Sequence, residues 1–411
     1  MKLMILDGNS VINRAYFGVK PLTTREGIYT HAIYGFLNIL ERMEKEEKPD
    51  AVCVAFDLHG PTFRHNRYEG YKANRHGMPE ELAQQMPLMK QVLTAMNIPI
   101  YAAQGWEADD VIGTVGKRCG EENWDCVIVT GDRDSLQLID PHVKVKLVIS
   151  KPGQTSATLY DEEVFRGEYG FEPKRMVDLK ALMGDSSDNI PGVAGVGPKT
   201  ATDLLLKFGT LDGVYAHLED SSIRPKLREK LEAGRENAYL SYELATIIPE
   251  APIEFDPRDA ILRDYNRPEL YALFQKLEFV RLIDRYGLRG AAAEAAVTEK
   301  REVASLPREE KIPEKLPLCA LYFAPDGSLG LAWEAGVCGL TPMELQMQTL
   351  PKFEQVILHD ARASMHLLEE AGLSWDAVAF DTALAAYDLN PSQSDYPVSK
   401  LATTFLGKTV E

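Results

Sequence analysis

The stretch LMILD at Leu3–Asp7 is a short apolar run that stops on an aspartate, and it has two counterparts further along the chain. AVCVAFD at Ala51–Asp57 and CVIVTGD at Cys126–Asp132 follow the same pattern. Apolar runs of this length predict buried strands of a parallel sheet. Ligands of open parallel sheets bind at the carboxyl ends of the strands, so we expect the three aspartates to converge there.

More carboxylates accompany these strand ends, in WEADD at Trp106–Asp110 and in GDSSD at Gly184–Asp188. So many negative charges need a strongly positive partner, and a divalent metal ion is the natural one. Magnesium prefers hard oxygen ligands, and the set contains none of the histidine or cysteine that zinc prefers. The sequence predicts a magnesium site that draws on Asp7, Asp57, Glu107, Asp109, Asp110, Asp132, Asp134, Asp185 and Asp188.

The spacing of these acids supports one shared site. Glu107 and Asp110 should share a face on the first turn of a helix, with Asp109 to one side, and Asp132 and Asp134 should follow one strand end. Two magnesium ions together could neutralise a scissile phosphate, activate a water molecule and stabilise the leaving oxygen. The alternative is that individual acids merely cap helix N-termini.

A glycine-rich segment, GVAGVGPKTA at Gly192–Ala201, follows the last acidic group. Its glycines permit tight turns and a close approach by a phosphate backbone, and a helix should begin near Pro198 with its free N–H groups facing the anion. The spacing does not match a Walker P-loop. We expect a grip on duplex DNA through Gly192, Gly195, Gly197, Lys199 and Thr200, although such turns are often purely structural.

A basic segment, FRHNRYEGYKANR at Phe63–Arg75, interleaves cations with aromatic rings. Cations can contact phosphates and aromatic rings can stack on unpaired bases, a combination typical of single-stranded nucleic acid binding. The alternative is a solvated helix face. Because the segment lies just beyond Asp57, we favour DNA contacts by its cations and aromatic rings, namely Arg64, Arg67, Lys72 and Arg75 interleaved with Phe63, Tyr68 and Tyr71.

Length and composition indicate a globular protein of two or three domains: 411 residues, 45% hydrophobic, with a formal net charge of −17. Five cysteines without CxxC spacing indicate neither disulfides nor zinc and favour a reducing cytoplasm, and no stretch resembles a signal peptide or a membrane span. We expect an α/β parallel-sheet nuclease core at 1–170 with a helical arch near 63–90, a helical subdomain at 171–288, a linker at 289–315 and a partial second α/β domain at 316–411.

Five motifs in order closely resemble the 5′-nuclease domain family of bacterial DNA polymerase I, within the flap endonucleases: ILDGN, FDLHGPTFRHNRYEGYKANR, WEADD, TGDRDSLQL and GDSSDNIPGVAGVGPKTA. The resemblance covers about residues 1–288. It implies a monomeric, cytoplasmic and nucleoid-associated enzyme that cuts DNA at 5′ flaps and nicks and removes RNA primers in replication and repair. It also implies two Mg²⁺ ions, for which Mn²⁺ could substitute.

The resemblance also implies roles for individual residues. Asp7, Asp57, Glu107 and Asp109 would surround the first metal; Asp132, Asp134 and Asp188 would serve the second; and Asp110 and Asp185 would support them from outside. Lys72 would contact the scissile phosphate, while Arg75, Tyr71 and, less strongly, Arg64 would help to position the strand. Residues 190–209 would form a helix-hairpin-helix-type grip on the duplex that can bind K⁺.

AFDTALAAYDLNPSQSDYPVSKLATTFLG at Ala379–Gly407 resembles the 3′-5′ exonuclease-like domain of the same polymerases, which is ribonuclease H-like. The expected first strand, LCALYFA, lacks the Asp-x-Glu pair of active relatives, and Ser364 stands where a further metal-binding aspartate is expected. We therefore expect this domain to be inactive. No polymerase domain is expected in the chain, although the family normally carries one, so neither synthesis nor proofreading is expected.

Two other functions deserve comparison. A catalytically idle DNA-binding module would gain nothing from so much negative charge near DNA. A small-molecule phosphatase with Asp7 as nucleophile would want a second acid two positions on, where Asn9 stands. The nuclease is the leading hypothesis.

Overall fold

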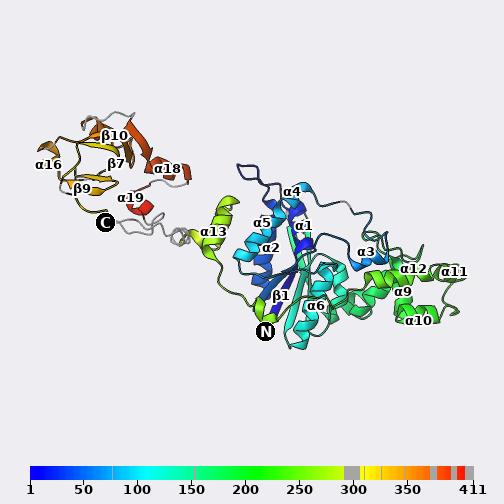
Figure 1. Cartoon of the computed structure of the whole chain (residues 1–411). Helices are drawn as coiled ribbons and strands as arrows, with labels where there is room; N and C mark the ends of the chain where they lie inside the picture. The colour runs from blue at the N-terminus through cyan, green and yellow to red at the C-terminus, as the bar shows by residue number, and fades with distance from the viewer. Residues whose placement is uncertain are drawn as a thin grey trace. The chain divides into compact units, whose positions relative to one another are not determined.

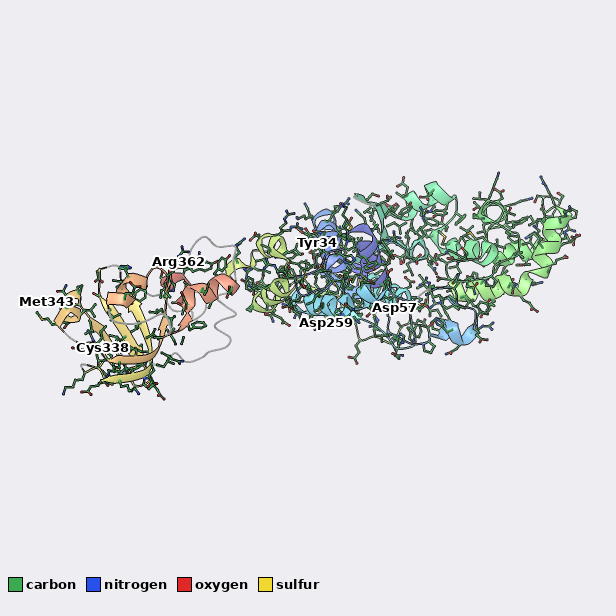
Figure 2. All side chains as sticks on the ribbon, turned by 90° about the horizontal axis from the view of Figure 1, so that it is seen from above. Tyr34, Asp57, Asp259, Cys338, Met343 and Arg362 are labelled. Carbon is green, nitrogen blue, oxygen red and sulfur yellow. The ribbon has the colours of Figure 1, made fainter. Side chains whose placement is uncertain are left out.

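The computed structural model describes residues 1–75, 77–151, 154–290, 306–309, 311–324, 326–347, 349–370, 377–389 and 396–402. The chain divides into two compact units, Met1–Tyr286 and Gly287–Glu411, each of which is described by itself (Figure 1). Tyr34, Asp57 and Asp259 belong to the first unit, and Cys338, Met343 and Arg362 to the second (Figure 2). Within the described ranges, no helix is both long and apolar enough to span a bilayer.

The first unit is built on a six-stranded sheet in the order β3-β2-β1-β4-β5-β6. All neighbouring pairs are parallel except β5 and β6, which are antiparallel. The expected parallel α/β core is therefore confirmed. The strands are β1 (Lys2–Asp7), β2 (Ala51–Ala55), β3 (Ile100–Tyr101), β4 (Asp125–Thr130), β5 (Val143–Lys151) and β6 (Gln154–Tyr160).

The central strands are buried over almost their whole length because helices cover both faces of the sheet. On one face, Leu3 and Ile5 of β1 share a core cluster with Val111 and Val115 of α6 (Ala108–Glu121). Helices α1 (Gly8–Gly18), α2 (His31–Glu47) and α5 (Gln85–Ala95) lie on the other side of the strands from α6 (Figure 1). The strand ends are thus held rigidly, which fixes where their aspartates point.

The chain between β2 and α5 corresponds to the expected arch. It contains α3 (Phe63–Arg67) and α4 (Glu80–Ala83), and residues 69–74 between them form turns rather than helix. Directly after α4 the chain continues into α5, so residues 80–95 form two helices rather than one.

The rest of the first unit is mainly helical. Its glycine-rich segment connects α8 to α9, and α9 begins at Pro198 as predicted, with the proline in the first helical turn. Helix α12 packs against α8. The elements are α7 (Glu162–Tyr169), η1 (Arg133–Leu138), η2 (Pro173–Arg175), α8 (Met176–Met183), α9 (Pro198–Phe208), α10 (Leu211–Ala216), α11 (Pro225–Ala233), α12 (Arg235–Ala245), η3 (Pro257–Ala260), α13 (Arg267–Lys276) and α14 (Val280–Arg285).

The second unit contains a five-stranded sheet in the order β11-β10-β7-β8-β9, so the expected α/β character is confirmed. Strands β11, β10 and β7 are parallel, and β7, β8 and β9 are antiparallel. The elements are η4 (Leu288–Gly290), β7 (Lys315–Phe323), β8 (Leu329–Trp333), β9 (Gly336–Leu340), α16 (Pro342–Met347), β10 (Lys352–Leu358), α17 (Met365–Glu370), β11 (Val378–Asp381), α18 (Thr382–Leu389) and α19 (Val398–Leu401).

Several expectations stay predictions. Most of the expected linker (291–305 and 310) and parts of the exonuclease-like motif (390–395 and 403–407) lie outside the described residues. The division of the first unit near residue 170, the ribonuclease H-like character of the second unit and its inactivity are likewise not tested.

Candidate active site

The carboxyl ends of β1 and β4 meet through a threonine. Asp7 ends β1 and caps α1, because its Oδ1 accepts a hydrogen bond from the amide of Ser10 at 2.9 Å. Its other oxygen accepts one from Thr130 Oγ1 at 2.7 Å. The amide of Asp132 in turn donates to Thr130 Oγ1 at 3.0 Å. Asp7 and Asp132, which are distant in the sequence, therefore both form hydrogen bonds with the buried hydroxyl of Thr130.

Asp57 and Asp109 join the same edge of the sheet. Asp57 Oδ1 accepts a hydrogen bond from the amide of Ala108 at 2.7 Å, which ties the end of β2 to the first turn of α6. The amide of Asp57 donates to Asn9 Oδ1 at 3.0 Å. Asn9 thus serves as a support for Asp57 at the place where a phosphatase would need an acid.

We call Asp7, Asp57, Asp109 and Asp132 the carboxylate quartet. Burial, reinforced by Asp57 and Asp132, raises the pKa of Asp7 to about 6. Burial and then the charges of Asp7 and Asp132 raise the pKa of Asp109 well above its usual range. Burial also raises the pKa of Asp57. Among the described residues, no lysine or arginine forms an ion pair with the quartet.

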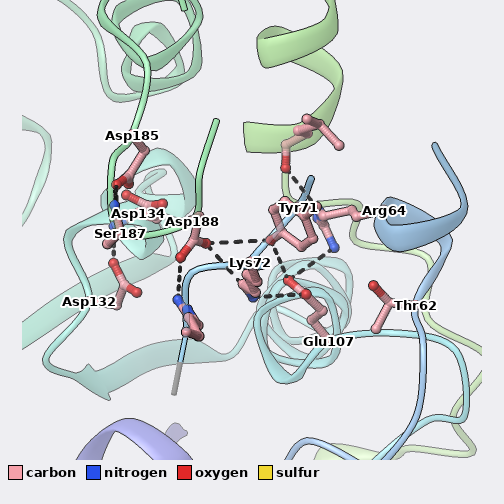
Figure 3. A network of polar contacts seen from close by, with 12 residues as sticks. Thr62, Arg64, Tyr71, Lys72, Glu107, Asp132, Asp134, Asp185, Ser187 and Asp188 are labelled. Carbon is pink, nitrogen blue, oxygen red and sulfur yellow. Dashed lines mark hydrogen bonds and ion pairs between the residues drawn. The ribbon is translucent and has the colours of Figure 1, made fainter. Parts of the chain in front are cut away.

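The other five predicted acids are each paired with a basic side chain. Figure 3 shows the contacts of Glu107 with Lys72 and Arg64. Glu107 Oε1 lies 2.8 Å from Lys72 Nζ, and Asp188 forms an ion pair with Arg75 and a longer one, 3.8 Å, with Lys72. Lys180 lies between Asp134, at 2.6 Å, and Asp185. Asp132 contacts both groups of acids, because its Oδ1 also accepts a hydrogen bond from the amide of Asp134 at 2.9 Å. The predicted assignment of the acids to two metals stays a prediction.

Lys72 and Arg75 lie beside the acids, as predicted. The backbone of Lys72 has a positive φ of 55° and its amide donates to the carbonyl of Asp188 at 2.9 Å, which fixes the turn against the GDSSD segment. Arg75 is exposed, with 50% of its side chain accessible. Both cations therefore lie at the acidic cluster, and their contact with a phosphate stays a prediction.

Tyr71 does not lie where a contact with DNA would require it. Its side chain is only 3% exposed, and its hydroxyl donates to Glu107 Oε2 at 3.0 Å. A ring that is buried against His65 cannot stack on a DNA base. A direct DNA contact by Tyr71 is therefore wrong for this structure, and its role is to orient Glu107.

The predicted DNA contact of Arg64 is not supported by the structure, and Asp110 is held as a supporting acid rather than as a direct ligand. Arg64 is 2% exposed and Asp110 is fully buried, and the two form a forked pair at 2.7 and 2.8 Å. Asp110 also accepts from the amides of Glu107 (3.2 Å) and Ile248 (2.9 Å). With both oxygens doubly occupied, Asp110 cannot be a direct metal ligand, and Arg64 cannot reach a phosphate. The nearby Arg67, which is exposed, pairs with Glu243.

The glycine-rich segment is partly structural. Gly192 is buried with φ of +59°, and a Cβ there would lie 2.2 Å from the backbone nitrogen of Gly184. Gly192 therefore packs against the acidic loop and leaves no exposed surface for the predicted DNA contact. Gly195, Gly197 and Lys199 are exposed and Thr200 is half-buried at the start of α9, and their contact with DNA stays a prediction. The predicted K⁺ stays untested.

Two residues escaped the sequence analysis. Arg14 lies two turns after Asp7 on α1 and donates to the carbonyl of Gly131, while its Nε is buried without a partner. Lys180 on α8 pairs with Asp134 and Asp185. The spacing of seven residues on one helix face was a usable signal for Arg14, whereas nothing in the sequence relates Lys180 to Asp134.

The quartet fits a divalent cation. It offers only hard oxygen donors, which suit magnesium, and its mutual repulsion is what a bound cation would relieve. Within the described residues, no three His, Cys, Asp or Glu side chains are already arranged around a common metal position. Metal ligation by Glu107, Asp134, Asp185 and Asp188 would require their ion pairs to open, and it stays a prediction.

The chain combines an α/β domain that carries converging acids with a helical extension, and both parts match known protein families. Residues 2–170 match the family described as the 5′-3′ exonuclease N-terminal resolvase-like domain, and residues 171–268 match the 5′-3′ exonuclease C-terminal SAM fold. Together the two matches cover more than half of the chain, which belongs to the 5′-3′ exonuclease family. The predicted nuclease class is confirmed.

Curated relatives are DNA polymerases I. That of Caldicellulosiruptor bescii is 37% identical over 100% of this chain and 49% of the relative. Those of Bacillus subtilis (34% identical; 98% of this chain and 47% of the relative) and Chloroflexus aurantiacus (38%; 96% and 39%) are similar. The chain spans about half the length of these relatives or less.

Solved structures with a similar fold have lower sequence identity to this chain than these relatives do. The bacteriophage T5 5′-exonuclease with bound zinc has a TM-score of 0.49 and 23% identity, over 61% of this chain and 90% of that chain. The catalytic core of Rad2 in complex with DNA has a TM-score of 0.47 and 17% identity, over 67% and 87%.

Proposed function

We propose that the chain is a divalent-metal-dependent 5′ nuclease that hydrolyses DNA at 5′ flaps and nicks and acts as a 5′-3′ exonuclease. The observation that carries the proposal is the carboxylate quartet at the ends of β1, β2 and β4, flanked by Lys72 and Arg75. The quartet supplies ligands for a cation, and the two basic residues supply charge for the scissile phosphate. Magnesium is the proposed metal, with manganese as a substitute, because every ligand is an oxygen.

The metal, when bound, would activate water and stabilise the charge that develops on the phosphate. The chain's own residues would position the strand. Lys72 and Arg75 now pair with Glu107 and Asp188, so a phosphate arriving at the cluster would compete for these two cations. The exposed part of the glycine-rich loop and the N-terminus of α9 would hold the duplex through backbone amides.

The relatives suggest the wider setting. Because curated DNA polymerases I are about twice as long, we propose that a polymerase domain acts with this nuclease and that RNA primers are among its substrates. Together, the nuclease and the polymerase domain would remove primers and repair nicks. A cytoplasmic, nucleoid-associated monomer is consistent with five free cysteines, four of them buried.

The test compares two aspartates on one strand segment. Asp132→Asn alters a residue two positions beyond the carboxyl end of β4, whereas Asp125→Asn alters an exposed residue at the amino end of this strand. With a labelled 5′ flap and Mg²⁺, we expect Asp132→Asn to lower the cleavage rate by about 10²–10³-fold, the size of losing one preorganised electrostatic group. Asp125→Asn should match the wild type, and EDTA should stop both. Full cleavage by Asp132→Asn, or cleavage in EDTA, would overturn the proposal.

A further inference from the structure

Arg64 carries a buried network that the proposed chemistry leaves unused. Its Nε donates to the carbonyl of Leu244 at 2.9 Å, and Nη1 donates to Asp110 at 2.7 Å and to Glu107 at 3.4 Å. Nη2 donates to Asp110 at 2.8 Å and to the carbonyl of Thr246 at 2.6 Å. A guanidinium has five N–H donors in a fixed fork, so every donor of this side chain has an acceptor.

The acceptors belong to two separate segments. Glu107 and Asp110 lie at the N-terminus of α6, and Leu244 and Thr246 lie at the C-terminus of α12. Free carbonyls at the end of a helix carry partial negative charge and favour a cation. Arg64, from α3, is therefore the residue that fastens these two helix ends together, and Figure 3 shows it between Glu107 and a helix end.

Each of these helix ends leads to a functional part of the molecule. On one side, Glu107 accepts hydrogen bonds from Tyr71 at 3.0 Å and from Lys72 at 2.8 Å. On the other side, Ser241 of α12 accepts one from the amide of Gly192, at 2.9 Å, in the glycine-rich loop. One buried side chain thus lies between the acidic cluster and the proposed duplex grip.

We propose that Arg64 is a positioning residue that fixes Glu107 and the first turn of α6 relative to α12, and so keeps the acidic cluster in register with the glycine-rich loop. The inference rests on the proposed nuclease function. It predicts that the planar fork matters and not the charge alone. A lysine has three donors on a flexible stem, so it cannot satisfy five acceptors in fixed directions.

The surroundings of Arg64 allow a chemical rescue. Arg64 lines a cavity of about 450 Å³ together with Phe63, Arg67, Tyr242, Leu244 and Thr246. In Arg64→Ala, a guanidinium ion from solution should therefore be able to enter the vacated place. Arg67→Ala is the matched control, because Arg67 is also on α3 but has 57% of its side chain exposed and pairs only with Glu243 at 2.6 Å among the described ion pairs.

The experiment measures kcat and KM on a labelled 5′ flap with Mg²⁺, together with circular dichroism and Mn²⁺ affinity by electron paramagnetic resonance. We expect Arg64→Lys to lower kcat by about 10–10²-fold, the effect of a misplacement of about 1 Å, with KM nearly unchanged. Its Mn²⁺ affinity should fall several-fold because Glu107 and the first turn of α6 lose their fixed place. Millimolar guanidinium should restore part of kcat to Arg64→Ala and should leave Arg67→Ala unchanged.

Wild-type kcat and Mn²⁺ affinity in Arg64→Lys would overturn the inference, and so would a folded Arg64→Ala that guanidinium does not restore. If Arg64→Ala does not fold, Arg64→Lys alone decides. If the wild-type chain does not cleave, the proposed function fails, and the Mn²⁺ affinity of Arg64→Lys then decides whether Arg64 positions the acids.

Discussion

Thr130 Oγ1 donates a 2.7 Å hydrogen bond to Asp7 Oδ2 across the boundary between β4 and β1. The same oxygen accepts the amide of Asp132 at 3.0 Å, and Thr130 is fully buried. One hydroxyl thus orients two members of the carboxylate quartet that are 125 positions apart in the sequence. This relationship leads to the first of four predictions.

Thr130→Val keeps the shape of the side chain and removes the hydroxyl. We expect the free energy of unfolding to fall by about 1–3 kcal/mol, because a buried carboxylate oxygen and a buried amide lose their partner. Urea denaturation measures the change. Thr130→Ser retains the hydroxyl, so its free energy of unfolding should fall clearly less than that of Thr130→Val. An equal fall in both variants would show that the methyl group, and not the hydrogen bond, stabilises the fold.

Lys72→Met removes a positive charge from beside Glu107 and Asp188. We expect cleavage to slow by about 10²–10³-fold, because the scissile phosphate loses a cation. Metal affinity should rise, since Lys72 no longer competes for the acids. Cleavage kinetics and Mn²⁺ titration measure the two effects. Lys174→Met, at an exposed position, is the control. A variant that cleaves at the normal rate would remove Lys72 from the mechanism.

The pKa values of Asp7 and Asp134, both raised to about 6 by burial and neighbouring carboxylates, predict a pH dependence. Unfolded aspartates have a pKa of about 3.9, so between about pH 4 and pH 6 the folded chain holds more protons than the unfolded chain. The contribution of these groups to stability is therefore present at low pH and is lost as pH rises through about 6.

Magnesium should reverse this loss, because it binds charged carboxylates. We expect the rise in Tm on adding Mg²⁺ to be larger at about pH 7.5 than at about pH 5, where protons compete for the site. Thermal unfolding at matched ionic strength with NaCl as control measures it. An equal rise at both pH values would contradict the assignment of these acids to the metal site.

Gly192→Ala and Gly197→Ala form a matched pair in one loop. A Cβ at Gly192 would collide with the backbone of Gly184, whereas a Cβ at Gly197 would meet nothing within 4 Å. We expect Gly192→Ala to lower the free energy of unfolding by about 1–3 kcal/mol through overpacking. The positive φ at this position should add to the loss, because alanine rarely adopts it. Gly197→Ala should change stability by less than about 0.5 kcal/mol. Urea denaturation of both variants decides, and similar losses would contradict the packing role of Gly192.

The sequence was sufficient for the architecture of the first unit and for the edge of the sheet where the acids meet. Short apolar runs such as Leu3–Leu6 are typical of buried strands, and a parallel sheet brings its carboxyl ends to one edge. The start of α9 at Pro198 and the place of Lys72 beside the acids were predictable for similarly local reasons.

The tertiary structure alone decided which acids are free and which are paired. Asp109 and Asp110 are neighbours in the sequence. Asp109 lies with the other acids of the carboxylate quartet, whereas Asp110 forms a buried ion pair with Arg64. Lys180 reaches Asp134 only because α8 packs near η1. Hydrogen bonds and ion pairs act over a few Å and depend on the direction of each side chain, whereas a sequence pattern specifies which residues share a strand end or a helix face.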